Sequence, residues 1–203
     1  MKKYLFLFTL LFLLPSCVEL AATNSIIAEK ATRTHRTIEQ VKKDNILEKE
    51  LNKKLKEELK VFTKINNIKR VGNFKLIVNE GRVFVIGNVA QDEINNFIYN
   101  KIWENKKVLE VINELKVDLD GVEKNSFKDF FIRQTVKFKL LTTSNIKSQN
   151  YTIVVKNGTV YIIGIAEDEI EIQKVGYLAS TVSGVDNVIV HVIEKNDSRR
   201  VLE

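Results

Sequence analysis

Two segments of the chain show the same alternation of hydrophobic and polar positions. Residues 73–87 (NFKLIVNEGRVFVIG) and 150–164 (NYTIVVKNGTVYIIG) match in pattern at an offset of 77 residues. Each contains two runs rich in β-branched and aromatic residues around a turn, Glu80-Gly81 in the first and Asn157-Gly158 in the second. Such turn residues, Asn-Gly above all, are typical of a tight β-hairpin. The pattern predicts an internal duplication with a hairpin at the centre of each copy.

A helical pattern precedes each hairpin and another follows it. The preceding patterns place hydrophobic residues four apart, which suits a helix packed on a sheet. These stripes are Leu47, Leu51 and Leu55 in the first copy, and Ile132, Val136 and Leu140 in the second. The patterns that follow the hairpins open with acidic residues, and a strand then closes each copy at residues 111–117 and 188–193.

These elements predict an α+β protein of two tandem α-β-β-α-β units, each a small mixed sheet with two helices on one face. The first unit is expected at residues 45–120 and the second at 127–195, with a short polar linker between them. A hydrophobic fraction of 44% in 203 residues is enough for packed cores. Units of this size are small but able to fold.

The N-terminus has the pattern of an export signal. Lys2 and Lys3 precede a hydrophobic run over residues 4–14, which is too short to span a bilayer comfortably. The run ends in Leu14-Pro15-Ser16-Cys17, which resembles the lipobox of bacterial lipoproteins. We therefore predict a signal peptide at 1–16, acylation of Cys17, and a tether from there to residue 44 in which His35 is solvated. The alternative is a cysteine that lies by chance near an ordinary cleavage site.

Sorting and charge point to an anionic membrane surface. Val18 rather than Asp follows the cysteine, which by resemblance to the lipoprotein sorting pattern favours the outer membrane, with the protein facing the periplasm. The formal net charge of +6 becomes about +4 without Lys2 and Lys3, and a positive chain is attracted to anionic surfaces. Because the protein is expected to be exported, we predict anionic phospholipid as its partner and do not expect it to bind nucleic acid. We expect a monomer.

The sequence contains no constellation that suggests catalysis or metal binding. The acidic clusters Asp92-Glu93 and 167–169 lack a histidine or third carboxylate at ligand spacing, so helix capping is favoured over a metal or acid/base site. The two histidines are far apart, and His191 lies in a hydrophobic run typical of a strand. Cys17 is the only cysteine and makes no intramolecular disulfide. We predict that the protein is not an enzyme and uses no cofactor.

The paired hairpins also carry a family resemblance. Both copies contain V-x-x-G-x-V-x-x-x-G, at residues 78–87 and 155–164, and the second contains ASTVSGVDNV at 179–188. These motifs are similar to those of the BON-domain proteins of bacterial envelopes, which include two-domain outer-membrane lipoproteins associated with division and envelope stress. The first copy departs from the pattern, with Lys107 where the second has Gly184, and with a longer connector before its hairpin. The glycines expected to be structural are Gly81, Gly87, Gly158, Gly164 and Gly184.

The resemblance implies that the second unit binds phospholipid through its opening helix, with an aromatic residue near the helix start entering the bilayer. Phe131 occupies that position. Helical geometry supports a second hydrophobic face, because Phe131 and Phe138 are seven residues apart and project in nearly the same direction, away from the core stripe. In the first copy, Ile46 and Lys53 take their places. The predicted phospholipid-binding residues are Phe130, Phe131, Arg133, Gln134, Lys137, Phe138 and Leu141.

The sequence therefore predicts a lipid-anchored periplasmic protein that binds anionic phospholipid and supports envelope integrity. One alternative is an adaptor that uses the phenylalanine face to dock envelope assembly or division proteins. Another is a structural spacer in which both sheets stack and the phenylalanines are buried. Tyr99 and Trp103 could form a further aromatic patch, although packing in the core or between the units is favoured.

Overall fold

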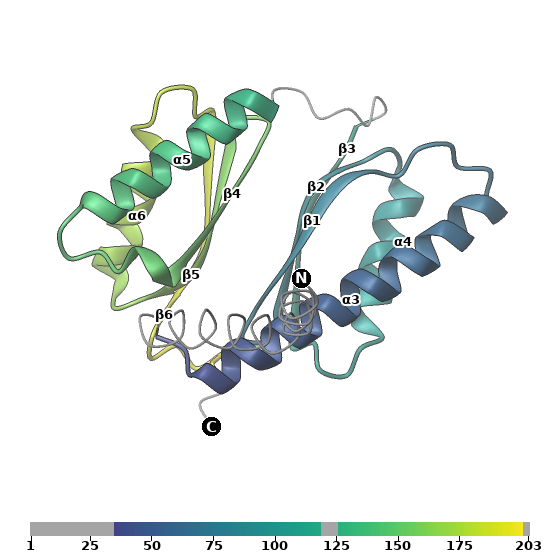
Figure 1. Ribbon diagram of the computed structural model, residues 1–203, viewed down its shortest axis with the longest axis horizontal. Helices are drawn as coiled ribbons and strands as arrows, with labels where there is room; N and C mark the ends of the chain where they lie inside the picture. Colours follow the sequence, from purple (N-terminus) through teal and green to yellow (C-terminus); the bar gives the residue numbers. More distant parts are fainter. Residues whose placement is uncertain (1–34, 119–125, 201–203) are drawn as a thin grey trace, which may run out of the picture.

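The computed structural model describes residues 35–118 and 126–200 (Figure 1). The predicted signal peptide, Cys17 and most of the predicted tether and linker lie outside the described residues. The first unit consists of α3 (Ile38–Ile65), β1 (Gly72–Asn79), β2 (Arg82–Val89), α4 (Asp92–Trp103) and β3 (Glu110–Val117). The second consists of α5 (Ser126–Thr142), the short 3-10 helix η1 (Ser148–Asn150), β4 (Tyr151–Lys156), β5 (Thr159–Ala166), α6 (Glu169–Ser180) and β6 (Asn187–Glu194). The predicted α+β class and the element order of both units are confirmed.

Each unit contains a three-stranded mixed sheet built on the predicted hairpin. The hairpin strands pair antiparallel, and the last strand of the unit adds in parallel to the second hairpin strand, which gives the orders β1-β2-β3 and β4-β5-β6. Both turn residues have positive φ in each hairpin, 52° and 72° at Glu80 and Gly81 and 48° and 74° at Asn157 and Gly158. These values are those of a type I′ turn, which matches the twist of the paired strands.

Two helices cover one face of each sheet (Figure 1). The predicted stripe of α3 packs with Val85 and with Ile94 and Ile98 of α4 in the first core. In the second core, the predicted stripe of α5 packs against β4, β5 and Val175 of α6. All six stripe residues are buried, as predicted. The helical spacing therefore identified the side of each opening helix that belongs to the fold.

The two sheets also pack against each other through their helix-free faces (Figure 1). Ile77, Phe84 and Ile86 of the first sheet form a buried cluster with Val154, Tyr161 and Ile163 of the second. Every residue of the central strands β2 and β5 is buried for this reason. His191 of β6 contacts Glu114 of β3 across the interface, Nε2 to Oε1 2.9 Å, which agrees with its predicted structural role. The described residues thus form four layers: helices, sheet, sheet, helices.

The first helix begins earlier than predicted. Thr37 and Gln40 form a capping box, so α3 starts at Ile38 rather than at residue 45. Its first turns continue the buried stripe through Val41 and Asp44. Because a buried carboxylate interrupts the hydrophobic pattern, the sequence in this region read as a tether. His35 is also packed against the protein rather than solvated, since only 13% of its side chain is exposed.

The predicted structural glycines have steric reasons. Gly81, Gly87, Gly158 and Gly184 adopt positive φ. Gly164 does not, but a Cβ there would lie 2.2 Å from the carbonyl oxygen of Asn150, and one at Gly87 would lie 2.4 Å from that of Asn73. The hairpin strands therefore approach too closely at these two positions for any side chain.

Candidate functional site

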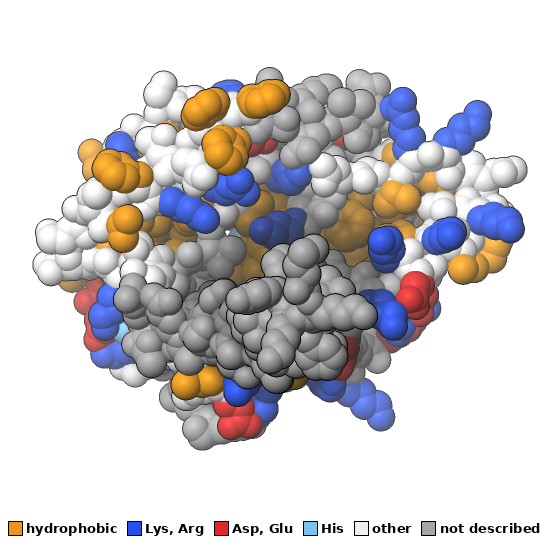
Figure 2. All heavy atoms as spheres, viewed as in Figure 1, with side chains coloured by type: hydrophobic (Ala, Val, Ile, Leu, Met, Phe, Trp, Pro, Cys, Tyr) orange, Lys and Arg blue, Asp and Glu red, His pale blue; other side chains and the backbone are white. Residues whose placement is uncertain are grey.

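The outward face of α5 is the main exposed hydrophobic surface of the second unit. While Ile132 and Val136 point into the core, Phe131 and Phe138 are 66% and 65% exposed. Phe130, Leu141 and Phe127 are exposed on the same side of the helix. Figure 2 shows hydrophobic side chains spaced along α5, in the upper left of the view, with Lys and Arg side chains beside them. The reading in which stacked sheets bury the phenylalanines is wrong: the sheets stack, but the phenylalanines stay on the surface.

Cationic and polar side chains border this hydrophobic face. The guanidinium carbon of Arg133 lies 5.6 Å from the ring centre of Phe130, a cation–π contact. Gln134 and Lys137 are exposed on the same side of α5. Lys139 instead donates a hydrogen bond to the Thr181 hydroxyl at 2.8 Å. All seven predicted lipid-binding residues therefore lie on one side of α5, and Phe127 extends this set by one helical turn.

Phe127 was missed because it stands at the predicted boundary between linker and domain. At about 100° per residue, it projects between Phe130 and Phe131 and belongs to the same face. A search of the helical pattern continued N-terminally by one turn would have found it. We call the surface formed by Phe127, Phe130, Phe131, Phe138 and Leu141 the phenylalanine face.

The opening helix of the first unit lacks such a face. Ile46, at the position of Phe131, is exposed, but Lys53 takes the place of Phe138. Charged side chains on this helix pair with neighbours, as in the contact of Lys54 Nζ with Glu104 Oε2 at 2.8 Å. The two helices share the inward stripe and differ in the outward residues, so the fold does not require the phenylalanine face.

One aspartate in the N-terminal part of each opening helix binds the hairpin turn of its unit. Asp44 accepts hydrogen bonds from the backbone N–H groups of Glu80 at 2.8 Å and Gly81 at 3.0 Å. In the second unit, Asp129 accepts from the N–H groups of Asn157 at 2.8 Å and Gly158 at 2.9 Å. Asp44 and Asp129 precede the two hydrophobic stripes at the same distance, three residues before Leu47 and Ile132. Sequence reasoning missed them, although this equivalent spacing was a signal.

The acidic clusters after the hairpins have structural roles. Asp168 caps α6 by accepting from the N–H of Glu171 at 2.8 Å, as predicted. Asp92 and Glu93 lie in the first turn of α4, whose N-cap residue is Gln91, so the capping prediction is wrong in detail there. Over the described ranges, no three His, Cys, Asp or Glu side chains are grouped as a metal site would require.

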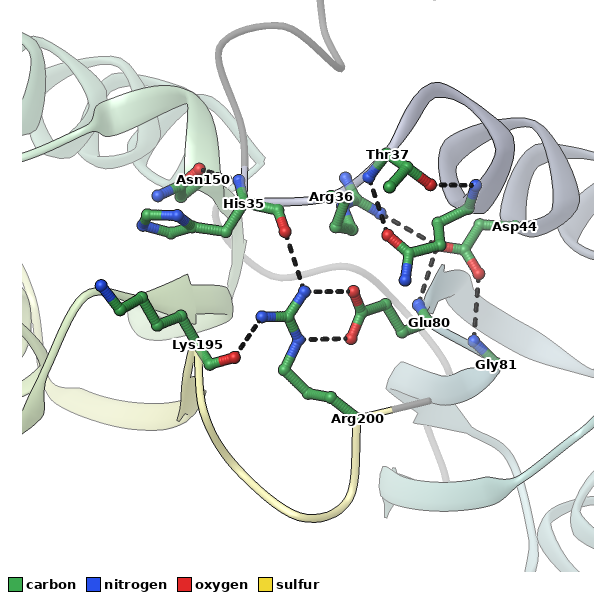
Figure 3. Close-up of polar contacts among 10 residues, drawn as sticks. His35, Arg36, Thr37, Asp44, Glu80, Gly81, Asn150, Lys195 and Arg200 are labelled. Atoms are coloured by element: carbon green, nitrogen blue, oxygen red, sulfur yellow. Dashed lines mark hydrogen bonds and ion pairs between the residues drawn. The ribbon is translucent and has the colours of Figure 1, made fainter. Parts of the chain in front are cut away.

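A buried polar cluster connects the two units with the segment that enters α3 (Figure 3). The guanidinium of Arg200 donates to both carboxylate oxygens of Glu80, at 2.8 and 2.7 Å, and to the carbonyl oxygen of His35 at 2.8 Å. The N–H of His35 donates to Asn150 Oδ1 at 3.0 Å. Burial and the nearby Lys147 lower the pKa of His35, although Glu167 opposes this. The cluster therefore ties both units to the chain that leads from the N-terminus.

Tyr99 and Trp103 on α4 are exposed, with ring centres 6.4 Å apart in an edge-to-face arrangement. The expectation that they pack in a core or between the units is wrong. Their spacing of four places them on the outer side of α4, while Ile94, Ile98 and Ile102 face the sheet.

The comparisons with known proteins agree with this fold. Residues 128–196, from α5 to just beyond β6, match the model of the BON domain. The chain belongs to the BON-domain family. It is 35% identical over 124 residues to an uncharacterised protein in the gshII 5′ region of Anaplasma centrale, covering 61% of this chain and 82% of the relative.

Two further relatives are named for envelope location or activity. The outer membrane lipoprotein DolP of Haemophilus influenzae is 24% identical over 189 residues, covering 93% of this chain and 94% of that protein. A 21 kDa hemolysin of Actinobacillus pleuropneumoniae is 26% identical over 129 residues, covering 63% of this chain and 66% of that protein. These similarities support a BON-domain protein of the cell envelope. Over residues 35–118 and 126–200, no helix has the length and hydrophobicity needed to cross a membrane.

Proposed function

We propose that this protein is a lipid-anchored envelope protein that binds anionic phospholipid through the phenylalanine face of α5 and thereby supports envelope integrity. It acts as a binding protein and not as an enzyme. The observation that carries the proposal is the exposure of Phe131 and Phe138 beside Arg133 and Lys137 on one side of α5. The equivalent helix of the first unit has no exposed phenylalanine and carries Lys53 at the position of Phe138, so this face serves something other than folding.

The physical chemistry of an anionic bilayer surface matches this face. Burial of an exposed phenylalanine contributes about 1.5–3 kcal/mol, and each Lys or Arg near an anionic surface contributes about 1 kcal/mol. α5 is a helix of 17 residues that presents both kinds of side chain on one side. A helix of this kind lies in the plane of the interface with its hydrophobic side in the headgroup layer.

An acyl anchor at Cys17 would strengthen this contact. Two attachments of one molecule to the same surface raise the effective concentration of the weaker one. The similarity to an outer membrane lipoprotein over 93% of the chain supports an anchor in the outer membrane with the folded units in the periplasm. The function of α5 is then to hold the tethered units against the membrane.

We also infer that the first unit is a diverged BON domain. The BON match covers the second unit, but the first has the same element order and the same strand order. Asp44 and Asp129 make equivalent contacts with the hairpin turns of their units. This similarity between the units goes beyond a shared order of elements. The two copies therefore share the fold, and the phenylalanine face belongs to the second copy.

Vesicle binding tests the proposal. A form that begins at Val18 retains every described residue, and we expect it to sediment with vesicles of phosphatidylglycerol and phosphatidylcholine but not with phosphatidylcholine alone. Phe131→Ala and Phe138→Glu should each weaken binding at least about tenfold, since one buried phenylalanine side chain exceeds 1.4 kcal/mol. Ile46→Ala, at the position equivalent to Phe131 in the first unit, is the matched control and should bind like the wild type.

The proposal fails if the wild type ignores anionic vesicles or if both phenylalanine variants bind normally. In the adaptor alternative, the same face would contact a protein. The adaptor alternative requires binding to vesicles that is weak and does not differ between anionic and zwitterionic lipid.

A further inference from the structure

A cationic groove lies beside the phenylalanine face, where the two units meet. It has a volume of about 420 Å³ and is lined by residues of β1 in the first unit and of α5 and β4 in the second. Phe130 and Arg133 belong to both the groove and the outward side of α5. Figure 2 shows Lys and Arg side chains between the hydrophobic residues over α5 and the middle of the molecule. A molecule that touches the phenylalanine face can therefore reach into the groove.

Three cations line this groove, each from a different element. They are Lys75 of β1, Arg133 of α5 and Lys156 of β4. Within the described residues, neither Lys75 nor Arg133 forms an ion pair. The guanidinium of Arg133 makes a cation–π contact with the ring of Phe130, at 5.6 Å. The positive charges of Lys75 and Arg133 are thus available to a ligand.

The single carboxylate that lines the groove is already engaged. Asp129 accepts hydrogen bonds on Oδ2 from the N–H of Asn157 at 2.8 Å and on Oδ1 from the N–H of Gly158 at 2.9 Å. Its negative charge stands against the three positive charges of the lining, and both of its oxygens point to the turn N–H groups. The groove as a whole therefore favours an anion.

We propose that this groove binds the phosphodiester of an anionic phospholipid whose acyl chains lie against the phenylalanine face. An Arg guanidinium matches two phosphate oxygens in a planar fork, and Lys adds a mobile point charge. Phe74 and Phe130 line the groove as hydrophobic neighbours for the glycerol and upper acyl carbons. The first unit thus contributes Lys75 to lipid recognition, although its own opening helix has no lipid face.

This inference rests on the proposed lipid binding, so its test must separate the two. Lys75→Glu reverses a charge on an exposed side chain of β1, and Lys106→Glu makes the same change on an exposed side chain in the loop between α4 and β3. Lys106 precedes β3, whose start pairs with the hairpin end of β2, whereas Lys75 pairs with Ile86 toward the other end of that strand. The two variants therefore share net charge but differ in position relative to the groove.

We expect Lys75→Glu to weaken binding to vesicles of 30% phosphatidylglycerol in phosphatidylcholine on the order of tenfold, through one lost attraction and one new repulsion. Lys106→Glu should change binding by less than about threefold, because general surface attraction is screened at physiological salt. Unchanged melting temperatures verify that both variants are folded. If Lys75→Glu and Lys106→Glu bind vesicles with the same affinity while Phe131→Ala does not bind, the groove inference is overturned and lipid binding through α5 stands. If the wild type does not bind vesicles, both proposals fail.

A second measurement distinguishes a lipid site from a phosphate site. Short-chain phosphatidylglycerol below its micelle concentration should shift the backbone amide signals of Lys75 and Arg133 in NMR spectra of the wild type, and Lys75→Glu should abolish the shift at Arg133. Inorganic phosphate and glycerol 3-phosphate at the same concentration should leave these signals unchanged. Equal shifts with inorganic phosphate would overturn the assignment to a lipid headgroup.

Discussion

Arg200 and Glu80 form a buried, two-pronged ion pair although 120 residues separate them in the chain. Each side chain is only 3% exposed. Arg200 follows β6 of the second unit, and Glu80 is a turn residue of the first, so the pair fixes one unit against the other (Figure 3). The same guanidinium binds the carbonyl oxygen of His35, just before α3. The chain from the proposed anchor therefore enters the folded units at a fixed point.

Removing one partner of this pair should strongly destabilise the protein. Glu80→Gln leaves the Arg200 charge buried with a neutral partner, and the loss of a buried ion pair member costs about 3–5 kcal/mol. Urea unfolding of the form that begins at Val18 measures the change. Arg199→Ala is the control, because Arg199 is about half exposed and pairs with the neighbouring Asp197. We expect the control to change the free energy of unfolding by less than about 1 kcal/mol. Equal effects would show that the pair does not hold the units together.

The aspartates that bind the hairpin turns should stabilise both units. Asp129→Ala removes two hydrogen bonds to a charged acceptor and leaves the N–H groups of Asn157 and Gly158 without it, so we expect a loss of about 1.5–3 kcal/mol or more. Asp44→Ala should cost more, because Asp44 also pairs with the buried guanidinium of Arg36, Nη1 to Oδ2 3.0 Å, and the loss of one member of a buried ion pair costs about 3–5 kcal/mol. Hydrogen exchange at the turn amides locates the change, which should stay within the unit that carries the substitution.

Asp186→Ala serves as the comparison for the aspartates. Its carboxylate is exposed and pairs with Lys128 at 3.3 Å. An exposed pair of this kind contributes about 0–1 kcal/mol. A larger loss for Asp186→Ala than for Asp129→Ala would contradict the role assigned to the turn contacts.

Local patterns in the sequence predicted the elements, because hairpins and packed helices are set by residues close in the chain. The type I′ turns follow from Asn157-Gly158 and its counterpart, and the buried stripes follow from spacing of four. The division of α5 into inward and outward faces was predictable for the same reason. The start of α3 was not, since a buried Asp44 is indistinguishable in sequence from a solvated one.

Stacking of the two sheets was one alternative that the sequence left open, but these patterns did not identify the residues that make the contacts between the units. Stacking of the sheets depends on Phe84 and Tyr161, which in the sequence read only as strand residues. The pairing of Arg200 with Glu80 joins segments with no common periodicity. The groove beside α5 arises from the same stacking, so Lys75 carried no signal of its own. Long-range geometry, rather than residue type, determines these parts of the site.

Gly164→Ala should be poorly tolerated because of backbone contact and not because of backbone conformation. A Cβ at this position would lie 2.2 Å from the carbonyl oxygen of Asn150, so the hairpin strands would have to separate. We expect a loss of about 1–3 kcal/mol, measured by thermal unfolding. Gly176→Ala on α6 is the control, since its Cβ would meet only Val190 Cγ2, at 3.3 Å. There, a gain in helix propensity of about 1 kcal/mol offsets the close contact. Similar losses in both variants would contradict the steric explanation.

Stability should fall in mild acid through His35. Burial, followed by the charge of Lys147, lowers the pKa of His35 in the folded state, while Glu167 and Glu171 act in the opposite direction. The unfolded state, with a His pKa of about 6.5, then binds the proton more readily. The contribution of His35 to stability is therefore fully present above about pH 6.5 and declines as the pH falls below that value. His35→Gln tests this cleanly, because the contacts of His35 with Asn150 and Arg200 are made by its backbone. Urea unfolding at pH 7.5 and 5.5 should show a smaller loss for His35→Gln than for the wild type, and identical losses would assign the pH dependence to other groups.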